Sequence, residues 1–263
     1  MKFVIDRDVR DRLLPHLMPH LRADENAGEG AFYPIVSLYY DNLDRDCYWE
    51  KIRGAKSRRK LRVRVYGSRD GALPPTTFVE VKHKCDGRGV KRRVRVSLED
   101  ALTIASGQPV ATPLSDVDQR IVDEVHQLVH RRGFQPCCCM RYDRQAFAGN
   151  DPTSDLRITF DTGVAYRFDN LTPVPDDHNF EVYLHQEGVS VMEVKVTGTV
   201  PYWLAKMLAE NGCVLQSHSK YCNSLEIGDA VLRRQLYGGP KKFGMADNSA
   251  AATTAPQLAQ AAA

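Results

Sequence analysis

The sequence lacks the features that would place the chain in a membrane or commit it to a nucleic-acid partner. No apolar run approaches the roughly 18 residues that a transmembrane helix needs. Residues 1–6 lack the long apolar stretch of a secretory signal peptide. Net charge is only +3, from 36 basic and 33 acidic residues. The pI of about 8.4 also falls short of the values above about 9 that are typical of nucleic-acid-binding domains. We therefore expect no membrane segment and no nucleic-acid partner.

A disulfide or zinc framework is also missing, although the chain has seven cysteines. Three of them, Cys137, Cys138 and Cys139, are consecutive. Neighbours on a strand point to opposite faces, so this run is poorly placed for pairing. No CxxC pair indicates a zinc site. A reduced, cytoplasmic setting is the simplest interpretation.

The chain does contain many short alternating segments rich in β-branched and aromatic residues. Strands are predicted at 35–40, 60–67, 78–84, 90–96, 138–147, 156–160, 164–168, 180–184 and 189–197. Glycines at 86–89 predict a hairpin turn between two of them. Helices are predicted at 6–22, 97–107, 116–132, 201–212 and 224–236.

The order of these segments predicts the fold class. Eight or nine strands follow one another without the regular crossover helices of a parallel sheet. We expect an α+β domain over residues 1–237, built on an antiparallel β-barrel with peripheral helices. The Ala- and Gln-rich residues 238–263 have no pattern and predict a disordered tail.

Positive charge gathers on one face of the predicted strands. Alternation places ten lysines and arginines on that face, against two glutamates. A solvated face of an open sheet would explain any single strand. Like charges facing one another on several strands destabilise a sheet, however, unless a polyanion such as a chain of phosphates neutralises them. The residues are Arg62, Arg64, Glu80, Lys82, Lys84, Lys91, Arg93, Arg95, Arg144, Arg157, Glu193 and Lys195, with Tyr142 beside Arg144.

The two glutamates of this face, Glu80 and Glu193, each precede a lysine by two residues. An exposed ion pair is one interpretation, worth under about 1 kcal/mol. The other is that one of them binds Mg²⁺ or Mn²⁺, which takes carboxylate oxygen together with substrate phosphates. Spacing alone does not separate the two.

Eight motifs, in order, resemble a known family. Residues 2–226 are similar to the VTC domain, the polyphosphate polymerase domain of the vacuolar transporter chaperone complex, which also occurs in bacteria as a free-standing protein. That domain belongs to the triphosphate tunnel superfamily. The motifs are SLYYD (37–41), LRVRVYG (61–67), FVEVK (78–82), VKRR (90–93), YDRQAF (142–147), RITFDT (157–162), MEVK (192–195) and SKY (219–221).

The resemblance implies an eight-stranded tunnel that holds a nucleoside triphosphate and a growing polyphosphate chain. Glu193 would hold the metal, usually Mn²⁺ in this family, with Mg²⁺ as the alternative. Ser219 and Lys220 are expected on a late strand or loop. Taken with the strand faces, the catalytic candidates are Arg62, Arg64, Lys82, Lys91, Arg144 and Lys220. The candidates for substrate binding are Lys2, Glu80, Lys84, Arg93, Tyr142, Arg157, Lys195 and Ser219.

We therefore expect a metal-dependent phosphotransferase that moves the γ-phosphoryl group of ATP onto polyphosphate. Two alternatives stay open: a triphosphatase of the same superfamily, and a module that binds polyphosphate or a nucleotide without turnover. ATP and polyphosphate are the expected partners. The eukaryotic relatives act beside a membrane channel, which leaves room for a membrane-protein partner.

Overall fold

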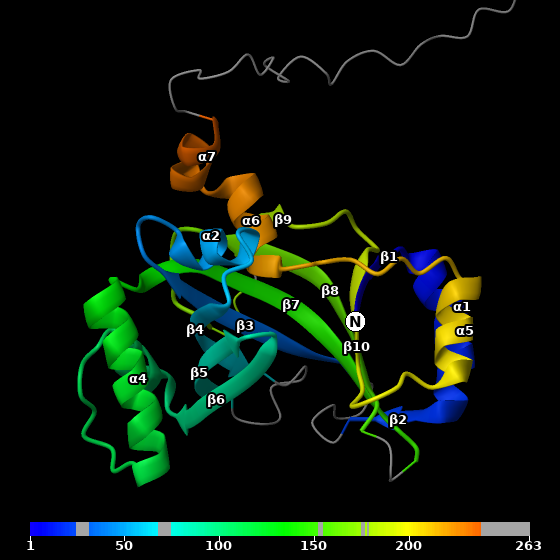
Figure 1. Cartoon of the computed structure of the whole chain (residues 1–263), viewed down its shortest axis with the longest axis horizontal. Helices are drawn as coiled ribbons and strands as arrows, with labels where there is room; N and C mark the ends of the chain where they lie inside the picture. The colour runs from blue at the N-terminus through cyan, green and yellow to red at the C-terminus, as the bar shows by residue number, and fades with distance from the viewer. Residues whose placement is uncertain (25–31, 68–74, 152–154, 175–176, 178, 238–263) are drawn as a thin grey trace, which may run out of the picture.

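The computed structural model describes residues 1–24, 32–67, 75–151, 155–174, 177 and 179–237. Its centre is a ten-stranded antiparallel sheet (Figure 1). Eight strands form one path in the order β1-β10-β8-β7-β3-β4-β5-β6, while β2 pairs with β7 and β9 with β8. The strands are β1 (Lys2–Ile5), β2 (Leu21–Ala23), β3 (Phe32–Asp41), β4 (Ser57–Tyr66), β5 (Thr76–Cys85), β6 (Arg88–Val96), β7 (Gln135–Gly149), β8 (Arg157–Arg167), β9 (Val182–Tyr183) and β10 (Ser190–Lys195).

The sheet curls around its own concave face without closing. Strands β1 and β6 are the two ends of the path, and no pairing joins them among the described residues. The expected eight strands are present in one antiparallel path, but the path is open, so the sheet only approximates the expected barrel. The concave face still gathers side chains from both ends of the path.

The hairpins β4–β5 and β5–β6 position one wall of this concave face. The predicted turn at 86–89 is confirmed, since β5 ends at Cys85 and β6 begins at Arg88. Asp86 and Gly87 both have positive φ, 46° and 83°, as a two-residue hairpin turn of the primed type requires. Alternation then sends one set of side chains inward and buries Leu61, Val63 and Val65 of β4 on the outer face.

The helices lie at the periphery, as predicted. They are α1 (Arg7–Leu17), α2 (Asp46–Ile52), α3 (Leu98–Ala105), α4 (Asp116–Arg132), α5 (Tyr202–Glu210), α6 (Lys220–Gly228) and α7 (Ala230–Tyr237), with the short 3-10 helix η1 (Met18–His20) after α1. In Figure 1, α4 stands beside β5 and β6, while α1 and α5 lie together near β1. The helix predicted at 116–132 is confirmed as α4, which Ser115 caps and Gly133, with φ of 66°, ends.

Five predicted elements have different bounds. The strands expected at 156–160 and 164–168 are one strand, β8, and the segment 180–184 contains only the two-residue β9. The helix expected at 224–236 is two helices, because the Asp229 side chain accepts from the backbone N–H of Leu232 and starts α7. The helix expected at 6–22 ends at Leu17, past Pro15, and is followed by η1 and β2. The predicted tail at 238–263 lies outside the described residues.

The apolar core fills the space between the outer face of the sheet and these helices. Val79 and Val81 of β5 are fully buried, as are Ile104 of α3 and Val125 of α4. All seven cysteines are free thiols. Among the described residues, no helix combines the length and the apolar character that spanning a membrane requires. Because the core lies outside the sheet, its concave face carries mainly charged and polar side chains together with several aromatic rings.

Candidate active site

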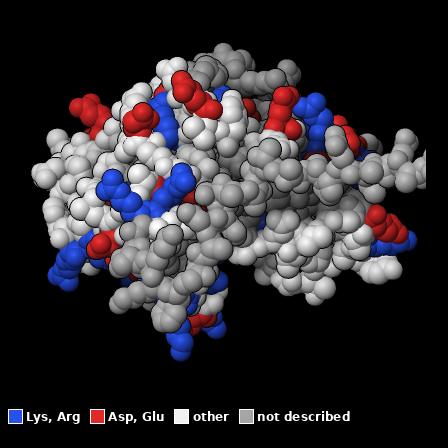
Figure 2. Space-filling view, turned by 90° about the horizontal axis from the view of Figure 1, so that it is seen from above, with Lys and Arg blue, Asp and Glu red and all other residues white. Residues whose placement is uncertain are grey.

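The concave face encloses a cavity of about 1570 Å³ with a strongly basic lining. Fifteen lysines and arginines line it, against the three carboxylates of Asp24, Asp161 and Glu193. On the surface seen in Figure 2, which views the molecule from above relative to Figure 1, acidic and basic side chains are by contrast intermixed. The small net charge of the chain therefore conceals a concentration of positive charge inside the sheet.

Strand register arranges part of this lining in rows across β4, β5 and β6. Lys60, Lys82 and Lys91 form one row, followed by Arg62–Glu80–Arg93 and then Arg64–Phe78–Arg95. Successive rows are two residues apart, or roughly 7 Å along the strands. Three lysines in one row repel one another, and burial followed by the charges of Lys2 and Arg62 lowers the pKa of Lys82. This wall is therefore short of negative charge.

Glu80 is the counter-ion of the middle row. Its carboxylate is 1% exposed and accepts from Arg62 Nε at 2.7 Å and from Lys91 Nζ at 3.0 Å. Burial alone would raise the pKa of Glu80, but Arg62, Arg64 and Lys91 outweigh it and lower the pKa to about 2. Because both oxygens of Glu80 already accept hydrogen bonds from cations, this carboxylate positions Arg62 and Lys91 and is poorly suited to hold a metal.

Tyrosine hydroxyls hold the arginines behind this wall. Tyr39 accepts from Arg62 Nη1 at 3.3 Å, and Tyr142 accepts from Arg64 Nη2 at 3.0 Å. Burial raises the pKa of Tyr142 to about 12, against the opposing charges of Arg64 and Arg144. For Tyr39 the two arginines Arg62 and Arg64 outweigh burial, and its pKa falls to about 8. The arginine forks are thus fixed before any ligand arrives.

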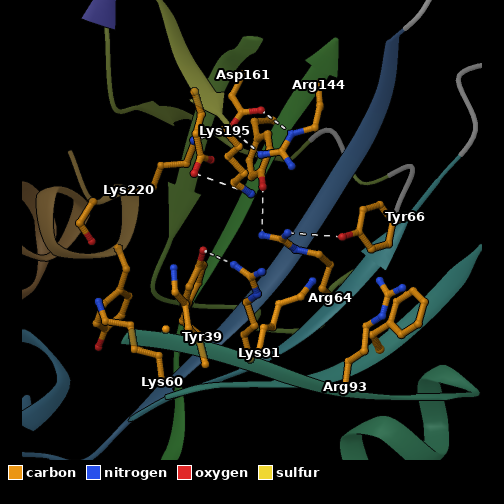
Figure 3. A pocket seen from close by; sticks show the side chains of 18 of the residues that line it. Tyr39, Lys60, Arg64, Tyr66, Lys91, Arg93, Arg144, Asp161, Lys195 and Lys220 are labelled. Atoms are coloured by element: carbon orange, nitrogen blue, oxygen red, sulfur yellow. Dashed lines mark hydrogen bonds and ion pairs between the residues drawn. The ribbon is translucent and has the colours of Figure 1, made fainter. Parts of the chain in front are cut away.

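A second buried carboxylate, Asp161, joins β7, β8 and α6. It accepts from Arg144 Nε at 2.6 Å and Nη2 at 2.8 Å, and from Lys220 Nζ at 2.5 Å (Figure 3). Burial would raise the pKa of Asp161, but Lys220 and Arg144 lower it below its usual range. Lys220 is the first residue of α6, and Ser219 caps that helix through the backbone N–H of Cys222 at 3.3 Å. Lys220 therefore reaches the cavity from a helix N-terminus, so the predicted strand or loop is wrong for Lys220, whereas Ser219 lies in the loop that precedes the helix.

Tyr221 anchors this helix end to the sheet. Its hydroxyl donates to Asp41 Oδ2 at 2.6 Å, at the end of β3. Its ring stacks on Tyr39, with 5.2 Å between centroids, and Lys60 Nζ lies 5.1 Å from its centroid. The ring is 2% exposed and closes the floor under Lys60.

Glu193 is the carboxylate best placed to share a metal with a ligand. It lies on β10 opposite Lys2 of β1, and its Oε1 is 3.7 Å from Lys195 Nζ. Burial would raise the pKa of Glu193, but Lys195, Lys2 and Arg144 lower it, so the group is ionised. No cluster of three or more metal-ligating side chains occurs in the part of the chain that the structure describes. Glu193 fits a metal that phosphates help to hold, because Mg²⁺ is usually bound by one or two carboxylates together with substrate phosphates.

Comparison with protein families supplies the decisive match. The model of the VTC domain matches residues 1–227. The chain belongs to the VTC domain family. The family resemblance drawn from the eight motifs is thereby confirmed.

Other comparisons add little to this assignment. The VTC domain is similar to the solved structure of a Hippeastrum protein, HpAC1, named as an adenylyl cyclase with a dominant triphosphatase activity. The two share 16% identity, with 86% of this chain and 95% of that chain covered and a TM-score of 0.48. A comparison with curated proteins gives no match. Family membership therefore rests on the VTC match alone.

The structure brings the predicted site residues of the VTC domain together. All of them line the main cavity except Glu80, which lies behind Arg62 and Lys91. Prediction missed Lys60 and Arg58, although both continue the alternation of Arg62 and Arg64 toward the start of β4. It also missed Asp161, which the RITFDT motif contains.

The cavity has two chemically different ends. The lysine end is formed by Lys51, Arg58, Lys60 and Lys84, and the aromatic end by Tyr33, Tyr66 and Phe78. Figure 3 shows Lys60 and Lys220 on one side of the cavity and Tyr66 with Arg93 on the other. From Arg58 to Tyr66 the lining follows β4 for roughly 25 Å. The arrangement can hold a ligand that is long, narrow and highly negative.

Proposed function

We propose that this VTC domain transfers the γ-phosphoryl group of ATP to the end of a growing polyphosphate chain. The observation that carries the proposal is the length of the basic lining, which follows β4 for roughly 25 Å with fifteen cations against three carboxylates. A compact triphosphate needs only part of such a cavity. A nucleoside triphosphate together with a linear chain of phosphates uses all of it.

The reaction requires positioning and neutralisation of charge. An oxygen of the terminal phosphate of the chain attacks the γ-phosphorus of ATP, the bond to the β–γ bridging oxygen breaks, and ADP leaves with that electron pair. Phosphoryl transfer needs little covalent help from the protein. Arg62, Arg64 and Arg144 bind equatorial phosphate oxygens with forks that are already oriented by tyrosine or carboxylate partners. Lys82, Lys91 and Lys220 supply the remaining positive charge.

Glu193 would help to hold a divalent metal, Mn²⁺ or Mg²⁺, which would supply positive charge that neutralises the bound phosphates. Glu193 itself supplies one ionised oxygen donor that faces the cavity. Lys2, Lys84, Arg93, Tyr142, Arg157, Lys195 and Ser219 complete the proposed substrate-binding set, with Glu80 positioning Arg62 and Lys91. Free thiols on all seven cysteines fit a reducing cytoplasm. We keep a membrane-protein partner as part of the proposal.

Glu193→Gln tests the proposal most directly, because it removes the charge and keeps the shape. The protein incubated with ATP and Mn²⁺ should yield ADP and long polyphosphate, and the variant should lose at least about 100-fold in rate with both products falling together. The melting temperature should stay close to that of the parent protein, since among the described residues the ion-pair partner of Glu193 is Lys195, at the long distance of 3.7 Å. Assays with and without a short polyphosphate primer identify the acceptor.

The products decide between the proposal and its alternatives. Release of inorganic phosphate without polymer would replace the polymerase with a triphosphatase. Tight binding of ATP and polyphosphate with no product at all would leave a binding module.

A further inference from the structure

The two ends of the cavity offer a bound nucleotide different surfaces. At the lysine end, the ring beneath Lys60 is that of Tyr221, which is 2% exposed and hydrogen-bonded to Asp41. That ring is part of the floor and has no free face. At the aromatic end, Tyr66 and Phe78 are each only half-buried, and both line the cavity.

The aromatic end is built as a stacking surface. Tyr66 meets Phe78 edge to face, with 5.8 Å between centroids, and Tyr33 lies 6.2 Å from Tyr66. The guanidinium of Arg93 lies 4.4 Å from the Phe78 centroid, and that of Arg64 5.7 Å from the Tyr66 centroid. Guanidinium planes and aromatic rings are the groups on which nucleobases stack.

Register places this surface at a suitable distance from the phosphate-binding rows. Tyr66 lies six residues along β4 from Lys60, roughly 20 Å, and four residues from Arg62. A nucleotide whose phosphates lie on the row of Arg62 therefore extends its ribose and base toward Tyr66 and Phe78. The reverse orientation would put an uncharged base among lysines that have no exposed ring beside them.

We infer that the aromatic end is a nucleobase platform, which fixes the direction of ATP in the cavity and leaves the lysine end to the polyphosphate chain. The inference rests on the proposed function in taking ATP as the ligand. Stacking reads no base edge, so the platform binds purine nucleotides with little discrimination between them and pyrimidine nucleotides more weakly.

Equilibrium binding in the presence of a chelator tests the platform without turnover. The probes are ATP, inorganic tripolyphosphate and ribose 5′-triphosphate, which lacks the base. The unmodified protein should bind ATP roughly tenfold more tightly than ribose 5′-triphosphate, the range expected for stacking of one base. This comparison needs no variant and is unaffected by any loss of folding.

Variants then locate the effect. Phe78→Leu and Tyr66→Leu should each weaken ATP binding by roughly five- to tenfold and leave tripolyphosphate binding within about twofold. Tyr66→Phe keeps the ring and should retain ATP affinity. Phe168→Leu is the matched control, because Phe168 is half-buried outside the cavity and should change neither ligand.

Two results would overturn the platform. Equal losses for ATP and tripolyphosphate would show that the rings serve only to hold Arg64 and Arg93, and equal affinities for ATP and ribose 5′-triphosphate would show that no base is bound. Both results are independent of the polymerase assay. A protein that makes no polymer but binds ATP through Phe78 keeps the platform and loses the proposed function, whereas one that makes polymer without base dependence does the reverse.

Discussion

The lysine end and the aromatic end of the cavity solve the same problem of like-charge repulsion by different means. Near the lysine end, Lys91 and Arg62 share one buried carboxylate, Glu80, whereas Lys51, Lys60 and Lys84 have no carboxylate partner among the described residues. At the aromatic end, Arg93 and Arg64 lie on the rings of Phe78 and Tyr66. A cation on a ring keeps its full charge, while an ion pair loses most of it. The lysine end therefore needs a polyanion to neutralise its charge. The aromatic end can bind an anion and, in addition, an apolar group that stacks on its rings.

The largest expected effect concerns the carboxylate near the lysine end. Glu80→Gln leaves Arg62 and Lys91 adjacent without their counter-ion, and breaking such a buried pair costs about 3 kcal/mol of unfolding free energy. The loss should show in denaturant unfolding. Tripolyphosphate should restore stability to the variant more than it stabilises the parent protein, because the ligand replaces the missing negative charge.

Glu124→Gln is the control for that change. Glu124 belongs to α4, which packs on the outer face of the sheet. Its carboxylate forms ion pairs with Arg59 Nε at 3.1 Å and with Arg92 Nη2 at 2.6 Å. Its loss should cost about 1 kcal/mol and give no extra response to tripolyphosphate. If the two variants lost equal stability, or if the ligand rescued neither, the lysine end would be no more dependent on a polyanion than the outer surface.

A smaller effect should separate the ligands by length. Lys60→Met removes one cation at the lysine end while keeping an apolar chain over Tyr221. Loss of one charge-assisted contact should weaken binding of long polyphosphate by about tenfold. ATP should lose less than that, because its base lies at the opposite end. Competition binding with both ligands measures the difference, and an equal loss for both would place ATP at the lysine end as well.

The sequence predicts which side chains of β4, β5 and β6 face the cavity. It does not predict which residues from distant parts of the chain contact them. Alternation along β4, β5 and β6 predicts which side chains share a face, because neighbours two apart on a strand must do so. The same rule, extended toward the start of β4, also predicts that Lys60 and Arg58 face the cavity. Asp161 does not, since its role depends on Lys220, a residue 59 positions later on a different element.

Gly163 explains the main error in the predicted strands. Gly163 lies between residues 156–160 and 164–168, which the sequence pattern predicts as separate strands, and a glycine at such a position is typical of either a break or a bulge. Gly163 instead has φ of 58° inside the continuous strand β8, where the register with β7 shifts between Arg141 and Asp143. The glycine allows a bulge, and the strand continues beyond it. Sequence alone does not distinguish a bulge from a turn when the pairing partner is unknown.

The next prediction concerns pH and uses Tyr39, which lies between the two ends. Its pKa of about 8 means that the phenol becomes an anion above that pH, neutralising Arg62 and repelling phosphate. Affinity for tripolyphosphate should therefore fall severalfold between pH 7 and 9. Tyr39→Phe should remove this decrease. Tyr142→Phe should retain it, because the pKa of Tyr142 is about 12 and its phenol stays neutral throughout.

The smallest effects are expected at the rims, and they provide the most specific test of the comparison. Lys84 at the lysine end and Arg95 near the aromatic end are both exposed side chains of the cavity lining. Each should contribute about twofold to binding at low ionic strength and almost nothing at high salt, because exposed charges are screened. Lys84→Ala should affect long polyphosphate and spare ATP, whereas Arg95→Ala should affect ATP and spare long polyphosphate. Salt titrations of both variants with both ligands measure this crossed pattern. If each variant weakened both ligands alike, the two ends would differ in composition without differing in what they bind.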